Sequence, residues 1–426
     1  MLFWPAIILF LLMATSHVLG ARVFRHWLRG QDERLAGMET VPSAVKFTPT
    51  VAVILSVRGM DPFLGRTIEA LLNQSYDAFH IHVIVDGVLE PVQAICRSSK
   101  KGASNITWHQ LESPSLSCGL KCSALLQVLG TLDKTIEVIA LIDADVVPHE
   151  TWLADLIRPL SDERVGAVTG TMVRASASTN ISQWMGSAIR ALWNAGSIVP
   201  TSMVKNPWAG TLAIRRTDLD SANLQELWSK SIVDDGPIKK SMHGIGQRVE
   251  FVPSLIAINR ETCSISFVVQ YVTRMLTWSR WYEASFWNTA VHAAFMLIAW
   301  AILGLAISFA VWGGRYGESL ILVGALATGI LEYISAFYIV RNSIHRMLRR
   351  QSLSVNGFLR HSIFRVSAAA FLIVLTQVVF FTGVIRALCS RRIRWRGIEY
   401  EVRGPYQVTM TGYRPHAEQT PGTDSL

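Results

Sequence analysis

Four long apolar stretches constrain this chain more than any other feature of its sequence. They cover residues 2–20, 289–312, 319–340 and 366–385. Each is about 20 residues long, and a helix needs about 17 to 25 residues to cross the hydrocarbon of a bilayer. Half of the 426 residues are hydrophobic and only 17% are charged, which excludes disordered and collagen-like chains. The sequence therefore predicts an integral, multi-pass membrane protein.

The first stretch predicts a membrane anchor, residues 1–20, with a cleaved signal peptide as the alternative. No basic residue precedes the stretch, whereas four arginines follow it, namely Arg22, Arg25, Arg29 and Arg34. By the positive-inside rule, these arginines hold the following chain on the cytoplasmic side of the membrane. We therefore expect residues 21–288 to form one cytosolic domain with its own core, ending in interfacial helices.

The rest of the chain predicts about three membrane helices in residues 289–388 and a basic tail in residues 389–426. The end of this tail is polar, and we expect it to be disordered. Arginines cluster beside the last two apolar stretches, which indicates anionic lipid headgroups rather than nucleic acid. If all four stretches cross the membrane, the tail lies on the face opposite to the domain. The arginines of the tail favour the cytoplasmic face instead, by the positive-inside rule. A re-entrant stretch would remove this conflict, and the sequence leaves the side of the tail open.

Strand-like and helix-like patterns alternate within residues 21–288. Apolar runs at 51–55, 81–85 and 138–142 predict buried strands, and residues 64–72 have the apolar spacing of a helix. This alternation predicts an α/β domain with a mostly parallel sheet. Because ligands of such sheets bind at the carboxyl ends of the strands, we expect the functional residues there.

Acidic residues stand at two of these strand ends. Asp86 ends the second apolar run, and Asp143-Ala-Asp145 follows the third. Alternate residues of a strand share one side, so the carboxylates of Asp143 and Asp145 can face one point. Two such carboxylates suit Mg²⁺ or Mn²⁺ when phosphate oxygens of a substrate complete the coordination shell. A solvated loop is the usual place for this short pattern, but its position after a buried strand favours the metal site.

Two adjacent acidic residues, Asp234 and Asp235, precede Gly236 and Pro237. Either could cap a helix that begins at this proline. The functional alternative is a general base that takes a proton from an acceptor hydroxyl. The residues alone leave both interpretations open.

Arginine and tryptophan recur in residues 264–281, directly before the second apolar stretch. The residues in question are Arg274, Trp278, Arg280 and Trp281. This pattern is typical of a helix that lies in the interface of a bilayer. The functional alternative adds contacts from these side chains to a diphosphate and a sugar ring.

Sequences near both ends of the chain match a known family. Arg58-Gly-Met-Asp-Pro62 with Leu64 is similar to K-G-x-D-P-x-L, and Trp395-Arg-Gly397-Ile-Glu-Tyr400 is similar to W-R-x-G-x-Y, one residue shorter. Between them, three aspartate motifs precede the Arg/Trp segment, as in (Q/R)-x-x-R-W. In these respects the chain resembles ceramide glucosyltransferases, which belong with the membrane-bound inverting GT-A glycosyltransferases. The resemblance runs from about residue 50 to about residue 404.

The chain departs from this family at the last motif. Read from Arg274, the motif is R-x-x-T-W with Thr277 in place of arginine, and read from Thr277 it ends in Arg280 and Trp281. The spacing from Ser264 favours the first register. The D-x-D sequence is also fuller than ceramide glucosyltransferases usually show, and a glycine rather than an aromatic residue follows Asp235.

The resemblance implies a GT-A domain that transfers a hexose, glucose from UDP-glucose, to a hydroxyl of a membrane lipid such as ceramide, with inversion. It implies that Asp86 contacts the base or ribose, that Lys121 approaches phosphate, and that Asp235 is the general base. Asp143 and Asp145 would hold Mg²⁺ or Mn²⁺. The other residues implied to bind the nucleotide sugar are Arg58, Arg274, Trp278, Arg280 and Trp281, and those implied on the acceptor side are Trp208, Gly210, Thr211 and Asp234.

Two other functions are compatible with the same motifs. A processive polysaccharide synthase shares the GT-A domain, the D-x-D sequence and the Arg/Trp motif, but the incomplete motif and only three C-terminal apolar stretches argue against a polymer channel. A membrane scaffold that kept the fold without catalysis is the non-enzymatic alternative. The presence of Asp86, Asp143, Asp145 and Asp235 together argues against it.

Overall fold

A computed structural model describes residues 3–40, 47–59, 61–87, 93, 105–174, 178, 180–350 and 363–415. The chain forms two compact units, which we describe separately. The helical unit comprises Met1–Gly30, Val173–Met203 and Arg260–Cys389. The sheet unit comprises Gln31–Met172, Val204–Asn259 and Ser390–Leu426.

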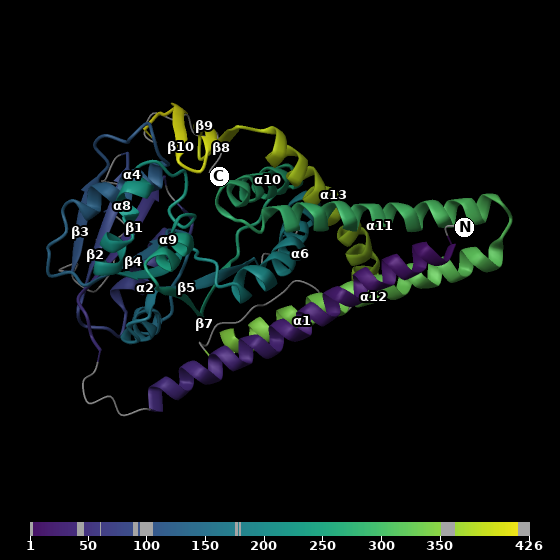
Figure 1. The fold of residues 1–426 in the computed structure, drawn as a ribbon, viewed down its shortest axis with the longest axis horizontal. Helices are drawn as coiled ribbons and strands as arrows, with labels where there is room; N and C mark the ends of the chain where they lie inside the picture. The colour runs from purple at the N-terminus through teal and green to yellow at the C-terminus, as the bar shows by residue number, and fades with distance from the viewer. Residues whose placement is uncertain are drawn as a thin grey trace. The chain divides into compact units, whose positions relative to one another are not determined.

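A seven-stranded sheet in the order β3-β2-β1-β4-β6-β5-β7 organises the sheet unit (Figure 1). Its parallel half contains β1 (Val51–Arg58), β2 (Phe79–Asp86), β3 (Ile106–Gln110) and β4 (Val138–Asp143). The other strands are β5 (Val165–Arg174), β6 (Thr211–Arg215) and β7 (Arg248–Asn259). β6 runs antiparallel to both β4 and β5. The predicted α/β class is confirmed, but the sheet is mixed, because strand direction depends on the connections and apolar runs do not encode it.

The central strands β1 and β4 are buried on both faces, which explains their continuous apolar runs. Ile68 and Leu71 of α2 pack into the main core with residues of β1, β2 and β4. The helices of this unit are α2 (Leu64–Leu72), α4 (Leu120–Leu129), α5 (Trp152–Ile157), α7 (Arg216–Ser221), α8 (Leu224–Trp228) and α9 (Ile238–Gly244), with a 3₁₀ turn at Arg158–Ser161.

A second, antiparallel sheet lies in the region that the sequence marks as a basic tail. It consists of β8 (Arg392–Trp395), β9 (Ile398–Gly404) and β10 (Gln407–Gly412), drawn in yellow in Figure 1. Arg396 and Gly397 form the two-residue turn between β8 and β9, and both have positive φ, 45° and 75°. This turn favours glycine and suits the twist of a hairpin. The end expected to be disordered is residues 414–426, of which residues 416–426 lie outside the described residues.

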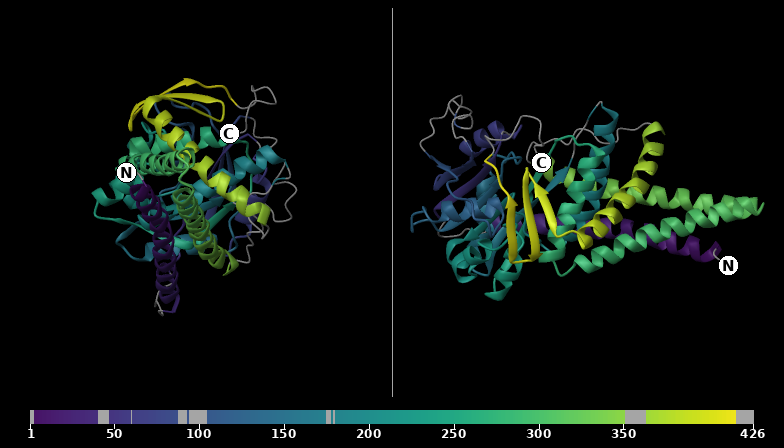
Figure 2. Two further views of the ribbon diagram at one scale, coloured as in Figure 1. Left: turned by 90° about the vertical axis from the view of Figure 1, so that its right-hand side faces the viewer. Right: turned by 90° about the horizontal axis from the view of Figure 1, so that it is seen from above.

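Among the described residues, four helices of the helical unit, drawn in Figure 2, are long and apolar enough to cross a membrane. The candidate spans are Phe3–Gly37, Phe286–Trp312, Tyr316–Leu348 and Ala370–Cys389. They lie in α1 (Phe3–Thr40), α11 (Phe286–Trp312), α12 (Tyr316–Arg350) and α13 (Ile363–Cys389). Each contains one of the four apolar stretches of the sequence. These four helices indicate a membrane protein, as predicted.

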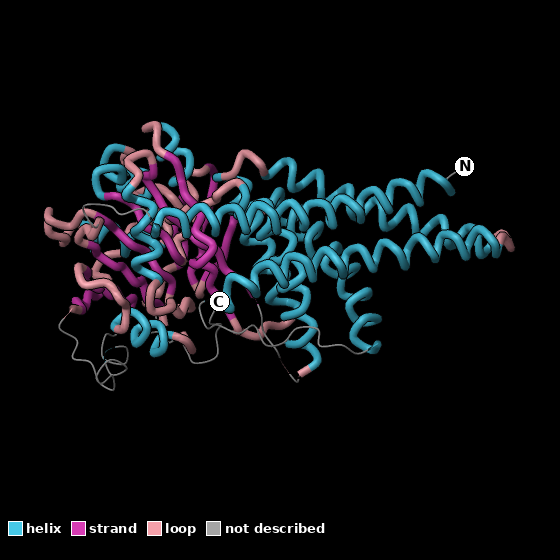
Figure 3. The backbone as a smooth tube through the Cα atoms, turned by 90° about the horizontal axis from the view of Figure 1, so that it is seen from below, coloured by secondary structure: helices cyan, strands magenta, loops and turns pink. Residues whose placement is uncertain are grey.

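The helices of this unit pack through two apolar clusters. One cluster joins α1, α11 and α12, and the other joins α6 (Ile181–Met203), α10 (Ile265–Tyr282), α11 and α13. Figure 3 shows α11 and α12 as the long antiparallel pair of cyan helices. Glu332 on α12 is the acidic residue within this apolar packing, and both of its carboxylate oxygens lie 3.1 Å from the hydroxyl of Thr15 on α1.

The two units divide the chain differently from the ranges expected from sequence. Residues 21–288 were expected to form one domain, but α6 and α10 pack with the apolar helices, because Ile189 of α6 and Val272 of α10 are buried against them. Conversely, the chain from Ser390 onward groups with the sheet unit rather than forming a separate tail. Packing partners distant in sequence decide this division.

Candidate functional site

The carboxyl ends of three neighbouring strands form the candidate site in the sheet unit. Arg58 at the end of β1 is in register with Asp86 at the end of β2. On the other side of β1, Ser56 is in register with Asp143 at the end of β4. The expected strand-end residues therefore lie at one edge of the sheet, where parallel sheets bind their ligands.

A lysine bridges two carboxylates at this edge. Nζ of Lys121 lies 2.6 Å from Oδ1 of Asp143 and 2.8 Å from Oδ2 of Asp234. The Asp234 side chain is 9% exposed, whereas that of Asp143 is 31% exposed. Asp143 thus presents its carboxylate to solvent, and Asp234 is covered.

Close approach of two backbone segments produces this bridge. Gly119, the N-cap of α4, donates its N–H to the carbonyl of Ser231 at 2.8 Å. A Cβ at this position would lie 2.1 Å from the carbonyl oxygen of Ile232, so only glycine allows the contact. The contact brings Lys121, in the first turn of α4, to the segment that carries Asp234.

The charge of Lys121 is stabilised by its two partners. Burial acts to lower the pKa of the Lys121 amine, but the adjacent carboxylates of Asp143 and Asp234 outweigh it and raise that pKa above its ordinary value. The amine is therefore a fixed positive charge at neutral pH. Such a charge beside an exposed carboxylate can contact an oxygen of a bound phosphate.

Asp145 is held by a residue that sequence reasoning missed. The side-chain amide of Asn259, at the end of β7, donates to Oδ2 of Asp145 at 2.9 Å. Asn259 is 1% exposed, so this hydrogen bond fixes the direction of a half-buried carboxylate. The only signal in the sequence is the position of Asn259 after an apolar run.

Asp143 and Asp145 supply a donor set that fits Mg²⁺ or Mn²⁺ bound together with a substrate. Among the described residues, no group of three or more histidine, cysteine, aspartate or glutamate side chains could hold a metal ion. These two ions commonly use one or two protein carboxylates, and phosphate oxygens and water complete their shell. Two hard oxygen ligands, one of them well exposed, therefore suffice for a shared site.

The expected acceptor loop lies directly against Asp143. A Cβ at Gly210 would lie 2.0 Å from Cζ2 of Trp208 and 2.7 Å from Oδ2 of Asp143. The Trp208 ring and the Asp143 carboxylate thus both pack closely against Gly210. Thr211 is 1% exposed, and its hydroxyl accepts a hydrogen bond from the indole of Trp152. Thr211 is therefore anchored in the core, whereas Trp208 is half-buried.

The segment with Asp234 and Asp235 is fixed through its backbone. The indole of Trp228 donates to the carbonyl of Asp234 at 2.7 Å. The N-cap residue of α9 is Pro237, and the backbone N–H of Ile238 donates to the carbonyl of Asp235 at 3.2 Å. Asp235 is half-buried, next to the covered Asp234.

Asp86 is buried beneath two other residues. Its side chain is 3% exposed, and one of its oxygens is paired with the guanidinium of Arg58. The hydroxyl of Tyr413, which follows β10, donates to the other oxygen at 2.6 Å. Tyr413 was not expected from the sequence, where it lies just ahead of the polar end of the tail.

The Arg/Trp segment forms α10 in the helical unit, whereas the carboxylates belong to the sheet unit. The guanidinium of Arg274 lies over the rings of Tyr271 and Trp278, at 5.8 Å and 5.2 Å from their centroids. Nη1 of Arg280 donates to the carbonyls of Ala387 and Leu388, at 2.7 Å and 2.9 Å, near the end of α13. Arg280 thus satisfies terminal carbonyls of a helix.

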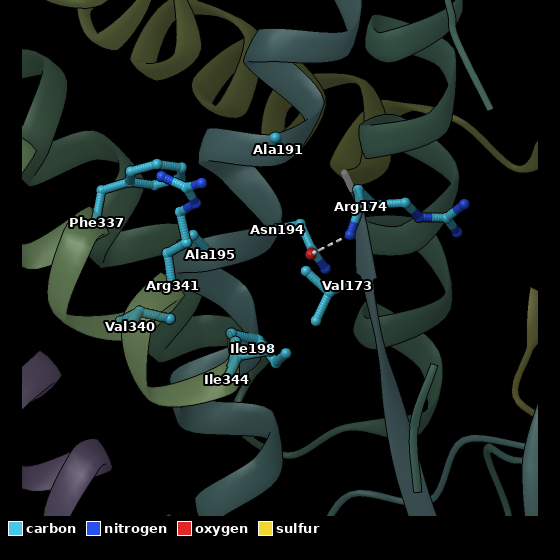
Figure 4. A pocket seen from close by; sticks show the side chains of 10 residues that line it. All are labelled: Val173, Arg174, Ala191, Asn194, Ala195, Ile198, Phe337, Val340, Arg341 and Ile344. Atoms are coloured by element: carbon cyan, nitrogen blue, oxygen red, sulfur yellow. Dashed lines mark hydrogen bonds between the residues drawn. The ribbon is translucent and has the colours of Figure 1, made fainter. Parts of the chain in front are cut away.

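The helical unit also contains a largely apolar cavity between α6 and α12 (Figure 4). The apolar lining residues are Val173, Ala191, Ala195, Ile198, Phe337, Val340 and Ile344, and the polar ones are Arg174, Asn194 and Arg341. The backbone N–H of Arg174 donates to Oδ1 of Asn194 at 3.1 Å, drawn as a dashed line.

Solved structures with a similar arrangement include two glycosyltransferases at low identity. The mannosyltransferase PcManGT from Pyrobaculum calidifontis, in complex with GDP-Man and Mn²⁺, is 14% identical, with 90% of this chain and 99% of that chain covered and a TM-score of 0.45. Glucosyl-3-phosphoglycerate synthase from Mycobacterium tuberculosis, in complex with Mn²⁺ and UDP-Glc, is 16% identical, with 57% and 82% covered and a TM-score of 0.34.

Comparison of the sequence with family profiles identifies the family of the chain. No curated protein sequence matches the chain significantly. The profile described as Glycosyl transferase family 21, however, matches residues 8–407, which is nearly the whole chain. The carboxylates and the lysine at the sheet edge lie within this match, as do the four apolar helices except for the first residues of α1. The chain therefore belongs to glycosyl transferase family 21, and it is a glycosyltransferase that transfers a hexose from a nucleotide sugar.

Proposed function

We propose that this enzyme transfers glucose from UDP-glucose to the hydroxyl of a membrane lipid such as ceramide, with inversion at the anomeric carbon. The arrangement of Lys121 between Asp143 and Asp234, beside Asp145, carries this proposal. It combines an exposed carboxylate, a fixed cation and a second carboxylate at the ligand-binding edge of the sheet. These groups suit a diphosphate that leaves with added negative charge.

Each residue at the sheet edge has a distinct role in this proposal. Asp143 and Asp145 would hold Mg²⁺ or Mn²⁺, which neutralises charge on the diphosphate when bound. Lys121 contacts a phosphate oxygen and keeps Asp143 in place. Trp208 lies beside Asp143 and forms one side of the space for the sugar and the acceptor. Arg58 and Asp86 belong to the nucleoside end of the site.

Asp235 is the proposed general base. Its carboxylate takes the proton of the acceptor hydroxyl while the hydroxyl oxygen bonds to the anomeric carbon. The bond from that carbon to the phosphate oxygen breaks on the opposite face, and its electron pair leaves with UDP. Displacement in line produces the inverted configuration. Asp234 is less suited to this role, because it is paired with Lys121 and its side chain is covered.

In the helical unit, we assign Arg274 and Trp278 to the nucleotide sugar. The use of Arg280 to bind carbonyls of α13 supports this register over the alternative that ends in Arg280 and Trp281. Arg274 lies against two aromatic rings and keeps a planar guanidinium that can bind phosphate oxygens.

A membrane lipid is the acceptor that the helical unit favours. A chain with four candidate spans works where its acceptor is already concentrated in the bilayer. The cavity between α6 and α12 has seven apolar lining residues and three polar ones, which suits an amphiphile better than a free sugar.

Transfer to a lipid can be tested with the purified full chain in liposomes. Release of UDP from UDP-glucose and from UDP-galactose, and of GDP from GDP-mannose, is measured with and without ceramide in the bilayer. We expect UDP-glucose to be consumed only when ceramide is present, and Asp143→Ala to abolish the release. A ladder of long saccharides from UDP-glucose without ceramide would instead identify a polysaccharide synthase.

We further propose that the sheet unit faces the cytoplasm, because four arginines directly follow the first apolar stretch. Protease added to sealed, right-side-out vesicles should leave the sheet unit intact until detergent opens the membrane. Digestion of β1–β7 before the membrane is opened would reverse this orientation.

A further inference from the structure

The C-terminal sheet is attached to the ends of β1 and β2 by several hydrogen bonds. Nε and Nη2 of Arg58 donate to the carbonyls of Arg396 and Arg414, both at 3.0 Å. In return, Nη1 of Arg396 donates to the carbonyl of Arg58 at 2.9 Å. The hydroxyl of Tyr413 donates to Oδ1 of Asp86 at 2.6 Å. The turn at Arg396 and the residues after β10 therefore cover the Arg58–Asp86 pair.

Further contacts attach this sheet to the start of α4. The backbone N–H of Leu120 donates to the hydroxyl of Tyr400 at 3.2 Å, and Tyr400 is fully buried. The N–H of Met410 donates to the carbonyl of Leu116 at 2.7 Å. Leu120 directly precedes Lys121, so the C-terminal sheet packs against the helix that supplies the cation of the site.

The Arg58–Asp86 pair lies about as far from the diphosphate site as the base of a bound nucleotide lies from its phosphates. Asp86 ends β2, and β1 separates β2 from β4, which ends in Asp143. Two strand spacings correspond to about 10 Å. This is of the order of the length from the base to the diphosphate of a nucleotide. A nucleotide with its phosphates at Asp143 can therefore place its base near the end of β2.

Asp86 itself is too covered to contact that base. Its side chain is 3% exposed, and the side chain of Arg58 above it is 6% exposed. Tyr413 is half-buried, and its ring lies 5.8 Å from the guanidinium carbon of Arg58. Of these three side chains, the Tyr413 ring is the one that the described structure leaves accessible to a ligand.

We propose that the C-terminal sheet forms one wall of the nucleoside part of the donor site and that the Tyr413 ring contacts the base. Asp86 is then a positioning residue, because it fixes the Tyr413 hydroxyl and the Arg58 guanidinium. This inference deepens the proposed function and rests on it. An aromatic ring held by a hydrogen bond at its far end is a rigid surface on which a base stacks.

The experiment measures binding of UDP and of inorganic pyrophosphate to the purified full chain, with Mn²⁺, by titration calorimetry. Stacking of a base on an aromatic ring changes affinity by about 5- to 150-fold. We expect Tyr413→Ala to weaken UDP binding within this range and to leave pyrophosphate binding within about twofold of the original. Tyr413→Phe keeps the ring and loses its anchor, so UDP binding should weaken about 2- to 5-fold.

Tyr406→Phe is the matched control. Tyr406 lies in the turn before β10, and Tyr413 follows the other end of that strand, so about 20 Å of strand separates them. Tyr406→Phe should change neither titration. Equal losses for UDP and pyrophosphate in Tyr413→Ala would show a general structural effect and overturn the proposal, as would unchanged UDP binding.

Tyr413→Phe decides the matter if Tyr413→Ala does not fold. Tighter UDP binding by Tyr413→Phe would overturn the proposal, because it would show that the hydroxyl blocks Asp86 from the nucleotide. A failure of the proposed donor is distinguishable from a failure of this inference. If the original chain binds GDP and not UDP, UDP-glucose is the wrong donor, and the same variants are compared with GDP.

Discussion

The adjacent aspartates of the site should respond differently to the same substitution. Asp234→Asn and Asp235→Asn each remove one negative charge and keep the size of the side chain. Asp234 lies 2.8 Å from Nζ of Lys121 and is covered, whereas Asp235 is half-buried and assigned as the base. We expect the first variant to lose stability and the second to lose turnover.

The magnitudes follow from the contacts. Removing one partner of a buried ion pair costs about 3–5 kcal/mol when the other charge is left alone. Lys121 keeps Asp143 at 2.6 Å, so we expect about 1.5–3 kcal/mol for Asp234→Asn, the range of a hydrogen bond to a charged group. For a unit of this size, that corresponds to a decrease in Tm of about 3–12 °C. Asp235→Asn should lower kcat by about 10²- to 10⁴-fold, because a general base is lost.

Three measurements on each purified variant separate these effects: kcat for UDP release, Kd for UDP, and Tm. Asp235→Asn should show the decrease in kcat with Kd for UDP and Tm close to the original values, because the base acts on the acceptor and not on the donor. Near-normal kcat in Asp235→Asn would remove this residue from the mechanism. A large decrease in kcat for Asp234→Asn at unchanged Tm would make Asp234 the base.

Three further results are expected. Asp145→Ala should abolish transfer and keep the fold, and complete chelation of divalent ions should stop the original enzyme; UDP release that survives chelation would contradict the metal assignment. Gly210→Ala should lower kcat/KM at least about tenfold, because its Cβ would lie 2.0 Å from the Trp208 ring; activity within twofold of the original would contradict this packing. Burial, with His80 and His109 nearby, lowers the pKa of His82 to about 4, so the unfolded chain binds a proton that the folded chain refuses between about pH 6.5 and 4. Tm should therefore fall as pH decreases through this range, and less so in His82→Asn; equal slopes would contradict the assignment.

The strand-end carboxylates were predictable because a short apolar run fixes where a buried strand ends. Asp86, Asp143 and Asp145 lie at the expected edge for this reason. The four long apolar helices were predictable because a candidate span requires one long apolar stretch. The catalytic roles of the strand-end carboxylates remain predictions.

The partners of these residues were not predictable, because they come from distant segments. Asn259 reaches Asp145 across 114 positions and Tyr413 reaches Asp86 across 327. No local pattern marks Tyr413, and the only signal for Asn259 is its position after an apolar run. Lys121 was expected near phosphate, but its bridge to Asp234 depends on the close approach at Gly119, which only the fold reveals.

Mass spectrometry of lipids tests the central claim most directly. The purified full chain is reconstituted with ceramide and ¹³C-labelled UDP-glucose, and the lipid extract is compared with that of the Asp143→Ala variant. The account predicts a labelled monohexosylceramide of inverted, β configuration from the original enzyme and none from the variant. Donor consumption with no labelled lipid, or the same lipid product from Asp143→Ala, would contradict it.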